Sequence, residues 1–204
     1  MIIKMRRLTA VFISLLIILI ILALIATPFP ADADNPDNYD HLALKVDDLD
    51  GDGVMEEYCL SEGILTVKKD GRNLLETPPD WQVEYFSLGD VNNDGNTELV
   101  FSLWKKGSFG KIRPFWHTGD NDSYKNHLFV YKLEEDIFKP VWCSSDLDRP
   151  ILSIDILDIN DDGLYELVVN EGQYQQPASF RPFTNITQTL TAWQWNQWGF
   201  YKLD

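Results

Sequence analysis

The stretches DLDGDGVME (48–56), DVNNDGNTE (90–98) and DINDDGLYE (158–166) decide the fold of this chain and align without gaps. Each has the pattern Asp-x-(Asp or Asn)-x-Asp-Gly-x-x-Glu, and apolar or alternating runs lie on both sides of each copy, for example WQVEYFSL (81–88) and LVFSLW (99–104). These runs are rich in Val, Ile, Leu and Phe and are too short for helices. Each acidic stretch is therefore predicted to be a loop between two β-strands.

A hairpin pattern follows each loop, with an alternating strand, a polar turn and a returning strand. The three hairpins are GILTVKKDGRNLLE (63–76), HLFVYKLEEDIFKPVW (127–142) and TLTAWQWNQWGFYKL (189–203). The repeated unit is then a four-stranded antiparallel sheet, and such sheets recurring around an axis are typical of propeller blades. The sequence predicts an all-β domain over residues 41–204 with three propeller-like blades, which is a partial propeller.

Oxygen atoms are concentrated in the three loops in a pattern that suits Ca²⁺, which takes six to eight oxygen ligands. Side chains at positions 1, 3, 5 and 9 and a backbone carbonyl at position 7 would provide them, with the position-6 Gly allowing the chain to reverse. The predicted metal ligands are Asp48, Asp50, Asp52, Val54, Glu56, Asp90, Asn92, Asp94, Asn96, Glu98, Asp158, Asn160, Asp162, Leu164 and Glu166. An EF-hand would need Glu at position 12, but Cys59, Phe101 and Val169 stand there. Up to three Ca²⁺ ions are expected.

These loops, set between strands, resemble the FG-GAP or VCBS repeats of integrin-α-like β-propellers, over roughly residues 40–204. The resemblance implies that each loop bridges two strands of a blade and binds calcium. It also implies that the domain is a scaffold for adhesion or ligand binding. The departure is the number of units, since propellers have about four to eight blades. A partial propeller and a homo-oligomer that completes a ring both stay open.

The N-terminal segment predicts a membrane anchor. Residues 1–7 (MIIKMRR) carry three positive charges and form the expected cytoplasmic tail. Residues 8–26 carry no charge and form an apolar stretch long enough for a transmembrane signal-anchor helix. Residues 27–40 form a linker rich in Pro, Asp and Asn. The expected location is the cell membrane, single-pass, with the C-terminal domain extracytoplasmic. A cleaved signal peptide ending near residues 31–33 would instead give a secreted protein.

Charge and cysteine content narrow the classes of partner. All 32 acidic residues but only 14 of the 17 basic ones follow residue 7, so this part has a formal charge of −18. Such a surface excludes nucleic acid as a partner and suits bound cations.

Cys59 and Cys143 lie outside the cytoplasm in this scheme, where a disulfide is chemically permitted, and the sequence does not decide whether they form one.

The long inserts of the second and third units, residues 105–126 and 171–188, both contain Arg-Pro-Phe. The predicted ligand- or partner-binding residues are Arg113, Phe115, Trp116, Arg181 and Phe183. No G-x-S-x-G or H-E-x-x-H motif occurs, and the chain is predicted not to be an enzyme. The leading hypothesis is a binding or adhesion module for a protein or glycan, whose loops hold the inserts in place. A polysaccharide-acting hydrolase or lyase and a structural subunit of an envelope complex are the alternatives.

Overall fold

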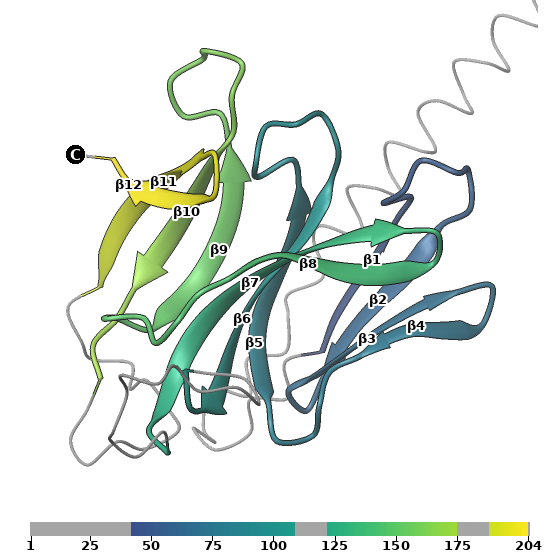
Figure 1. Cartoon of the computed structure of the whole chain (residues 1–204), viewed down its shortest axis with the longest axis horizontal. Coiled ribbons are helices and arrows are strands. Elements are labelled where there is room, and N and C mark those ends of the chain that lie inside the picture. Colours follow the sequence, from purple (N-terminus) through teal and green to yellow (C-terminus); the bar gives the residue numbers. More distant parts are fainter. Residues whose placement is uncertain (1–41, 109–121, 175–187, 204) are drawn as a thin grey trace, which may run out of the picture. The chain divides into compact units, whose positions relative to one another are not determined.

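The computed structural model of the chain describes residues 42–108, 122–174 and 188–203 (Figure 1). The predicted tail, signal-anchor helix and linker over residues 1–40 lie outside these ranges. So do the predicted binding residues Arg113, Phe115, Trp116, Arg181 and Phe183. The described ranges hold strands and turns without a helix, and hence no helix there that is long and apolar enough to cross a membrane.

The described residues form three four-stranded antiparallel sheets, which confirms the predicted all-β repeat. The first sheet contains β1 (Ala43–Asp47), β2 (Glu56–Ser61), β3 (Ile64–Lys69) and β4 (Arg72–Glu76). The second contains β5 (Gln82–Gly89), β6 (Glu98–Lys106), β7 (Tyr124–Glu134) and β8 (Ile137–Cys143). The third contains β9 (Ile151–Leu157), β10 (Glu166–Glu171), β11 (Thr189–Asn196) and β12 (Gly199–Lys202). Strands that follow one another in the sequence are neighbours in every sheet (Figure 1).

The three predicted hairpins are confirmed as β3–β4, β7–β8 and β11–β12. Two of them close through residue pairs with positive φ, Asp70-Gly71 (49° and 75°) and Glu135-Asp136 (52° and 61°). Positive φ at both central residues is typical of the turn whose twist matches that of paired strands. The second pair adopts it without a glycine, which places the side chains of Glu135 and Asp136 at the tip of the β7–β8 turn.

Two hydrophobic cores form, one on each face of the second sheet. On β6, Leu99, Phe101 and Leu103 belong to the core shared with the first sheet, whereas Val100 belongs to the core shared with the third. Successive side chains of a strand point to opposite faces, so a strand buried on both faces reads as a continuous apolar run. This explains why LVFSLW is apolar at every position except Ser102 and does not alternate.

The second and third sheets approach closely where β5 lies against β9. A Cβ atom placed on Gly89 would lie 3.0 Å from two side-chain carbons of Ile156, closer than ordinary van der Waals contact. Only a glycine allows this approach without displacing Ile156. The close contact fixes the position of the loop that follows β5 relative to the loop that follows β9.

The acidic loops and the described ends of the inserts lie at opposite ends of the strands. Strand β6 begins at Glu98, the last residue of the second loop, and runs to Lys106, the second residue of the insert in the second unit. The eight steps between these nine residues of extended chain span roughly 27 Å at about 3.4 Å per step. We therefore expect a structural change in a loop to reach an insert through the strands between them. Strand β6, which ends at Lys106, and strand β7, which begins at Tyr124, both extend into the predicted insert.

Candidate metal site

The three acidic loops have the same backbone conformation. They join the first and second strands of each sheet, as predicted. Position 4 has positive φ in every copy, with 72° at Gly51, 59° at Asn93 and 59° at Asp161. Position 6 also has positive φ, with 88° at Gly53, 89° at Gly95 and 85° at Gly163. Gly, Asn and Asp are the residues that adopt this left-handed region most readily, so the pattern Asp-x-x-(Gly/Asn/Asp)-Asp-Gly encodes the shape of the loop.

The position-1 aspartate closes each loop by accepting two backbone hydrogen bonds. In the first loop, Oδ1 of Asp48 accepts from N–H of Asp52 at 3.1 Å and Oδ2 accepts from N–H of Gly53 at 2.9 Å. The equivalent bonds to Asp90 are 3.0 and 2.9 Å, and those to Asp158 are 3.2 and 2.8 Å. Both oxygens of this carboxylate therefore already accept hydrogen bonds within the loop.

The position-9 glutamates are buried, with exposed fractions of 0% for Glu56, 1% for Glu98 and 0% for Glu166. In each case Oε2 accepts a hydrogen bond from the backbone N–H at position 2 of the same loop. The donors are Leu49 at 2.8 Å, Val91 at 3.1 Å and Ile159 at 3.1 Å. This bond ties the end of the loop to its beginning and leaves Oε1 of each glutamate available for other contacts.

In the second and third loops, side-chain amides meet the remaining carboxylate oxygens. Nδ2 of Asn92 donates to Oδ2 of Asp94 at 3.1 Å and to Oε1 of Glu98 at 3.0 Å. Nδ2 of Asn160 donates to Oδ2 of Asp162 at 3.0 Å, and Nε2 of Gln194 donates to Oε1 of Glu166 at 3.2 Å. The position-3 amide thus meets one oxygen of the position-5 carboxylate in both loops, whereas Oε1 of the position-9 glutamate meets Asn92 in the second loop and Gln194 in the third.

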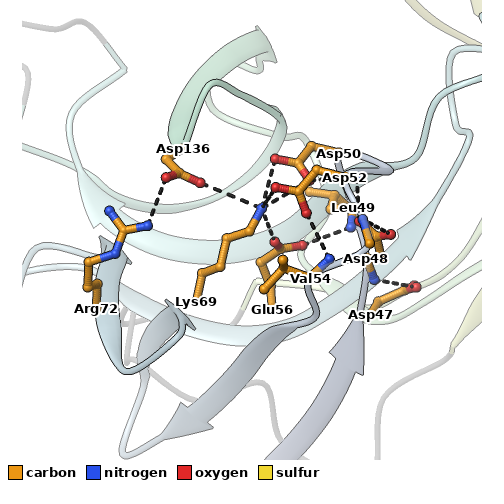
Figure 2. Close-up of polar contacts among 11 residues, drawn as sticks. Asp47, Asp48, Leu49, Asp50, Asp52, Val54, Glu56, Lys69, Arg72 and Asp136 are labelled. Carbon is orange, nitrogen blue, oxygen red and sulfur yellow. Dashed lines mark hydrogen bonds and ion pairs between the residues drawn. The ribbon is translucent and has the colours of Figure 1, made fainter.

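In the first loop the corresponding place holds a cation from the protein itself (Figure 2). Nζ of Lys69 lies 2.8 Å from Oδ2 of Asp52, 2.9 Å from Oε1 of Glu56 and 3.0 Å from Oδ2 of Asp50. It also lies 3.6 Å from Oδ1 of Asp136 in the β7–β8 turn. The Lys69 side chain is only 4% exposed. Lys69 was not among the site residues predicted from the sequence, although a two-residue turn at Glu62-Gly63 places it opposite Glu56.

Electrostatics differ between the first two loops. Burial acts to lower the pKa of Lys69, but hydrogen bonds to Asp52, Glu56 and Asp50 outweigh it and raise this pKa above its usual range. In the second loop, burial and the negative charge of Asp94 raise the pKa of Glu98 to about 7. An ionised Glu98 is therefore held at a free-energy cost that a bound cation would offset.

The donor set fits a hard metal ion. Carboxylate oxygens of Asp48, Asp50 and Asp52 lie within 4.8 Å of one another, so this triad could hold a metal ion. Position 3 is an amide in the other two loops, where Asn92 and Asn160 would contribute a carbonyl oxygen. The position-7 residues donate their backbone N–H to Oδ1 of the position-5 aspartate: Val54 at 2.8 Å, Asn96 at 2.9 Å and Leu164 at 2.8 Å. Their predicted role as carbonyl ligands stays a prediction.

An open cleft of about 970 Å³ lies between the first loop, the second loop and the β7–β8 turn. Acidic residues dominate its lining, and Lys132 and Lys139 are the basic ones. Both lysines form ion pairs with Glu134 of the same hairpin. The cleft is therefore a negatively charged depression beside two of the three loops.

A histidine, an aspartate and two serines also cluster at the opposite end of the second sheet. Nε2 of His127 lies 3.5 Å from Oδ1 of Asp146, and the hydroxyls of Ser108 and Ser123 bond to the same carboxylate. In a Ser-His-Asp triad the nucleophilic hydroxyl bonds to the imidazole instead. Burial and the nearby Lys105 lower the pKa of His127 to about 4, so the ring is neutral at pH 7.

The two cysteines are not bonded to each other. Cys59 lies on β2 of the first sheet and Cys143 at the end of β8 of the second, and both are free thiols in the structure. The disulfide that the sequence left open is therefore not formed here.

Comparison with known proteins adds no family to these observations. No known family model matches the chain, and no curated protein matches it at a significant level. The resemblance to FG-GAP and VCBS repeats therefore stays a prediction that rests on the three loops.

Proposed function

We propose that this protein is a calcium-stabilised binding or adhesion module, displayed outside the cytoplasmic membrane by residues 8–26. One observation carries the proposal: the three loops share a single hydrogen-bond frame in which the position-5 and position-9 carboxylates each keep one oxygen free of the backbone. Ligand oxygens from positions 1, 3, 5, 7 and 9 would bind up to three Ca²⁺ ions. Each bound ion would join the first and second strands of its sheet and stabilise the fold.

The three sheets are proposed to be blades of a partial β-propeller. They pack face to face through two cores and carry equivalent loops between their first and second strands. The end sheets still expose apolar side chains, with Leu44 and Val46 on the first sheet 67% and 65% exposed and Leu190 on the third 73% exposed. Self-association through such faces would complete a larger propeller, and sedimentation of the full-length chain tests it. A monomer at high concentration with Ca²⁺ present would exclude it.

The ligand surface is proposed to lie on the two inserts. Their described ends meet, because the hydroxyl of Tyr174 donates to the carbonyl of Leu147 at 2.9 Å and accepts from N–H of Asn126 at 3.1 Å. Nζ of Lys125 also lies 3.9 Å from the ring centroid of Tyr174. The end of one insert thus lies beside the start of the other, which supports a shared surface containing Arg113, Phe115, Trp116, Arg181 and Phe183. Aromatic and Arg side chains are the residues that most often dominate binding energy.

A double substitution tests this surface. Arg113→Ala with Arg181→Ala should abolish binding to the proteins or glycans that the wild type captures on arrays. The matched control is Lys132→Ala with Lys139→Ala, which removes the same charge from the β7–β8 hairpin. Binding that survives in the first double variant would contradict a ligand surface on the inserts.

A further inference from the structure

We propose that the ammonium group of Lys69 is the resident cation of the first loop, so that this loop is closed without metal and calcium binds at the second and third loops. The inference deepens the proposed function and rests on it. It assigns an ammonium group to the first loop and calcium to the other two, although the three loops share one sequence pattern.

The ammonium group of Lys69 lies where a metal ion of the first loop would lie. Nζ of Lys69 contacts oxygens of Asp50, Asp52 and Glu56 at 2.8–3.0 Å (Figure 2). These residues stand at positions 3, 5 and 9, which are the positions assigned to the metal in every loop. A Ca²⁺ ion would have to lie about 2.3–2.6 Å from the same oxygens. The ammonium group and a calcium ion cannot occupy this place together.

The strand register gives each loop a residue opposite its position-9 glutamate. Glu56 is paired with Lys69. The pairing of Leu99 with Tyr131 places Lys132 opposite Glu98, and the pairing of Leu167 with Trp193 places Gln194 opposite Glu166. The side chain of Lys132 is 44% exposed and pairs with Glu134, and Gln194 is neutral. Among these three residues, only Lys69 brings a buried charge to its loop.

The first loop also differs from the other two in the number of its acidic ligands. The first loop has a carboxylate at position 3, Asp50, where the others have Asn92 and Asn160. At positions 1, 3, 5 and 9, its four carboxylates together with the ammonium have the same net charge as the three carboxylates at these positions in either other loop. The additional acid and the lysine therefore belong together, as an ion pair built into the loop.

Lys69 is held from outside the loop as well. Oδ1 of Asp136 lies 3.6 Å from its Nζ, and Oδ2 of Asp136 accepts from Arg72 at 2.9 Å (Figure 2). Asp136 belongs to the β7–β8 turn, so Lys69 links the first loop to the second sheet. This contact, with a side chain only 4% exposed, opposes displacement of the ammonium by a free ion.

Counting bound calcium on the full-length chain in detergent, by equilibrium dialysis with radioactive Ca²⁺, tests the inference. We expect two ions per wild-type chain and three for Lys69→Met, because removal of the ammonium opens the first loop to metal. Lys69→Arg keeps the charge and should keep two ions, and so should the matched control Lys132→Met. Three ions on the wild type would overturn the inference and leave the proposed function standing, whereas no bound ion on any variant would overturn the proposed function itself.

A second pair of variants leaves Lys69 in place and so does not depend on the folding of Lys69→Met. Asp52→Asn and Asp94→Asn change the same loop position in the first and second loops. We expect two bound ions for Asp52→Asn and one for Asp94→Asn. Loss of an ion from Asp52→Asn would overturn the assignment of Lys69 as the cation of the first loop.

Discussion

Asn93 and Tyr165 connect the second loop to the third, although they are 72 residues apart in the sequence. Oδ1 of Asn93 accepts from the backbone N–H of Tyr165 at 2.6 Å, and its Nδ2 donates to the carbonyl of Tyr165 at 3.1 Å. One side chain thus satisfies both backbone groups of a residue in the neighbouring sheet. The contact joins position 4 of one loop to position 8 of the next, so the loops are coupled as well as equivalent.

Asn93→Gly should lower the free energy of unfolding by about 1–2 kcal/mol, because it removes two hydrogen bonds. Glycine is chosen because Asn93 has a φ of 59°, which glycine adopts without strain. Urea unfolding of the full-length chain measures the change. The matched control is Asp161→Gly, at the same position of the third loop and with the same φ of 59°. An equal loss in both variants would mean that the cross-sheet contact contributes nothing.

Glu98→Gln should change stability in opposite directions with and without calcium. Glutamine can still accept the hydrogen bond from Val91, loses the one from Asn92 and carries no charge. The relief of the buried charge outweighs the lost bond, so in chelator at pH 8 the variant should be more stable than the wild type by about 1–2 kcal/mol. With calcium it should be less stable, because a charged ligand is lost. Thermal unfolding in the two buffers measures both effects. A loss of stability in chelator would contradict the argument that the buried charge of Glu98 is costly.

His127 should make the protein sensitive to mild acid. Its pKa is about 4 in the folded protein, against an ordinary value of 6.5. Between these values the unfolded chain binds the proton more readily, so the stability contributed by neutral His127 is present above pH 6.5 and is lost as the pH falls toward 4. The loss is at most about 3 kcal/mol. His127→Gln should flatten the plot of unfolding free energy against pH in this range, and an unchanged slope would show that another group is responsible.

Much of the fold could be predicted because the repeat depends on local sequence features. Gly at position 6 and Gly, Asn or Asp at position 4 are required by the positive φ values there, and the alternating runs specify the hairpins. Strand ends were less predictable, since β6 continues to Lys106 and β7 begins at Tyr124, inside the predicted insert. Lys105 and Lys106 read as part of a polar connection, and the length of the pairing depends on the partner strand.

The contacts between sheets could not be predicted in the same way. Lys69 could have been placed opposite Glu56 from the turn at Glu62-Gly63, but its contact with Asp136 depends on how the first two sheets pack. The pairing of Asn93 with Tyr165 likewise depends on the close approach of β5 and β9 at Gly89. A repeat pattern specifies each sheet separately, and the packing of side chains decides how neighbouring sheets meet.

Thermal unfolding of the full-length chain in chelator and then with added Ca²⁺ tests the central claim most directly. Ligand that binds only the folded state stabilises it by about 2.7 kcal/mol for each site when present at 100 times its dissociation constant. We expect a clear rise of the unfolding midpoint with Ca²⁺, together with calcium in the purified protein by elemental analysis. An unchanged midpoint in a protein that contains no metal would contradict it.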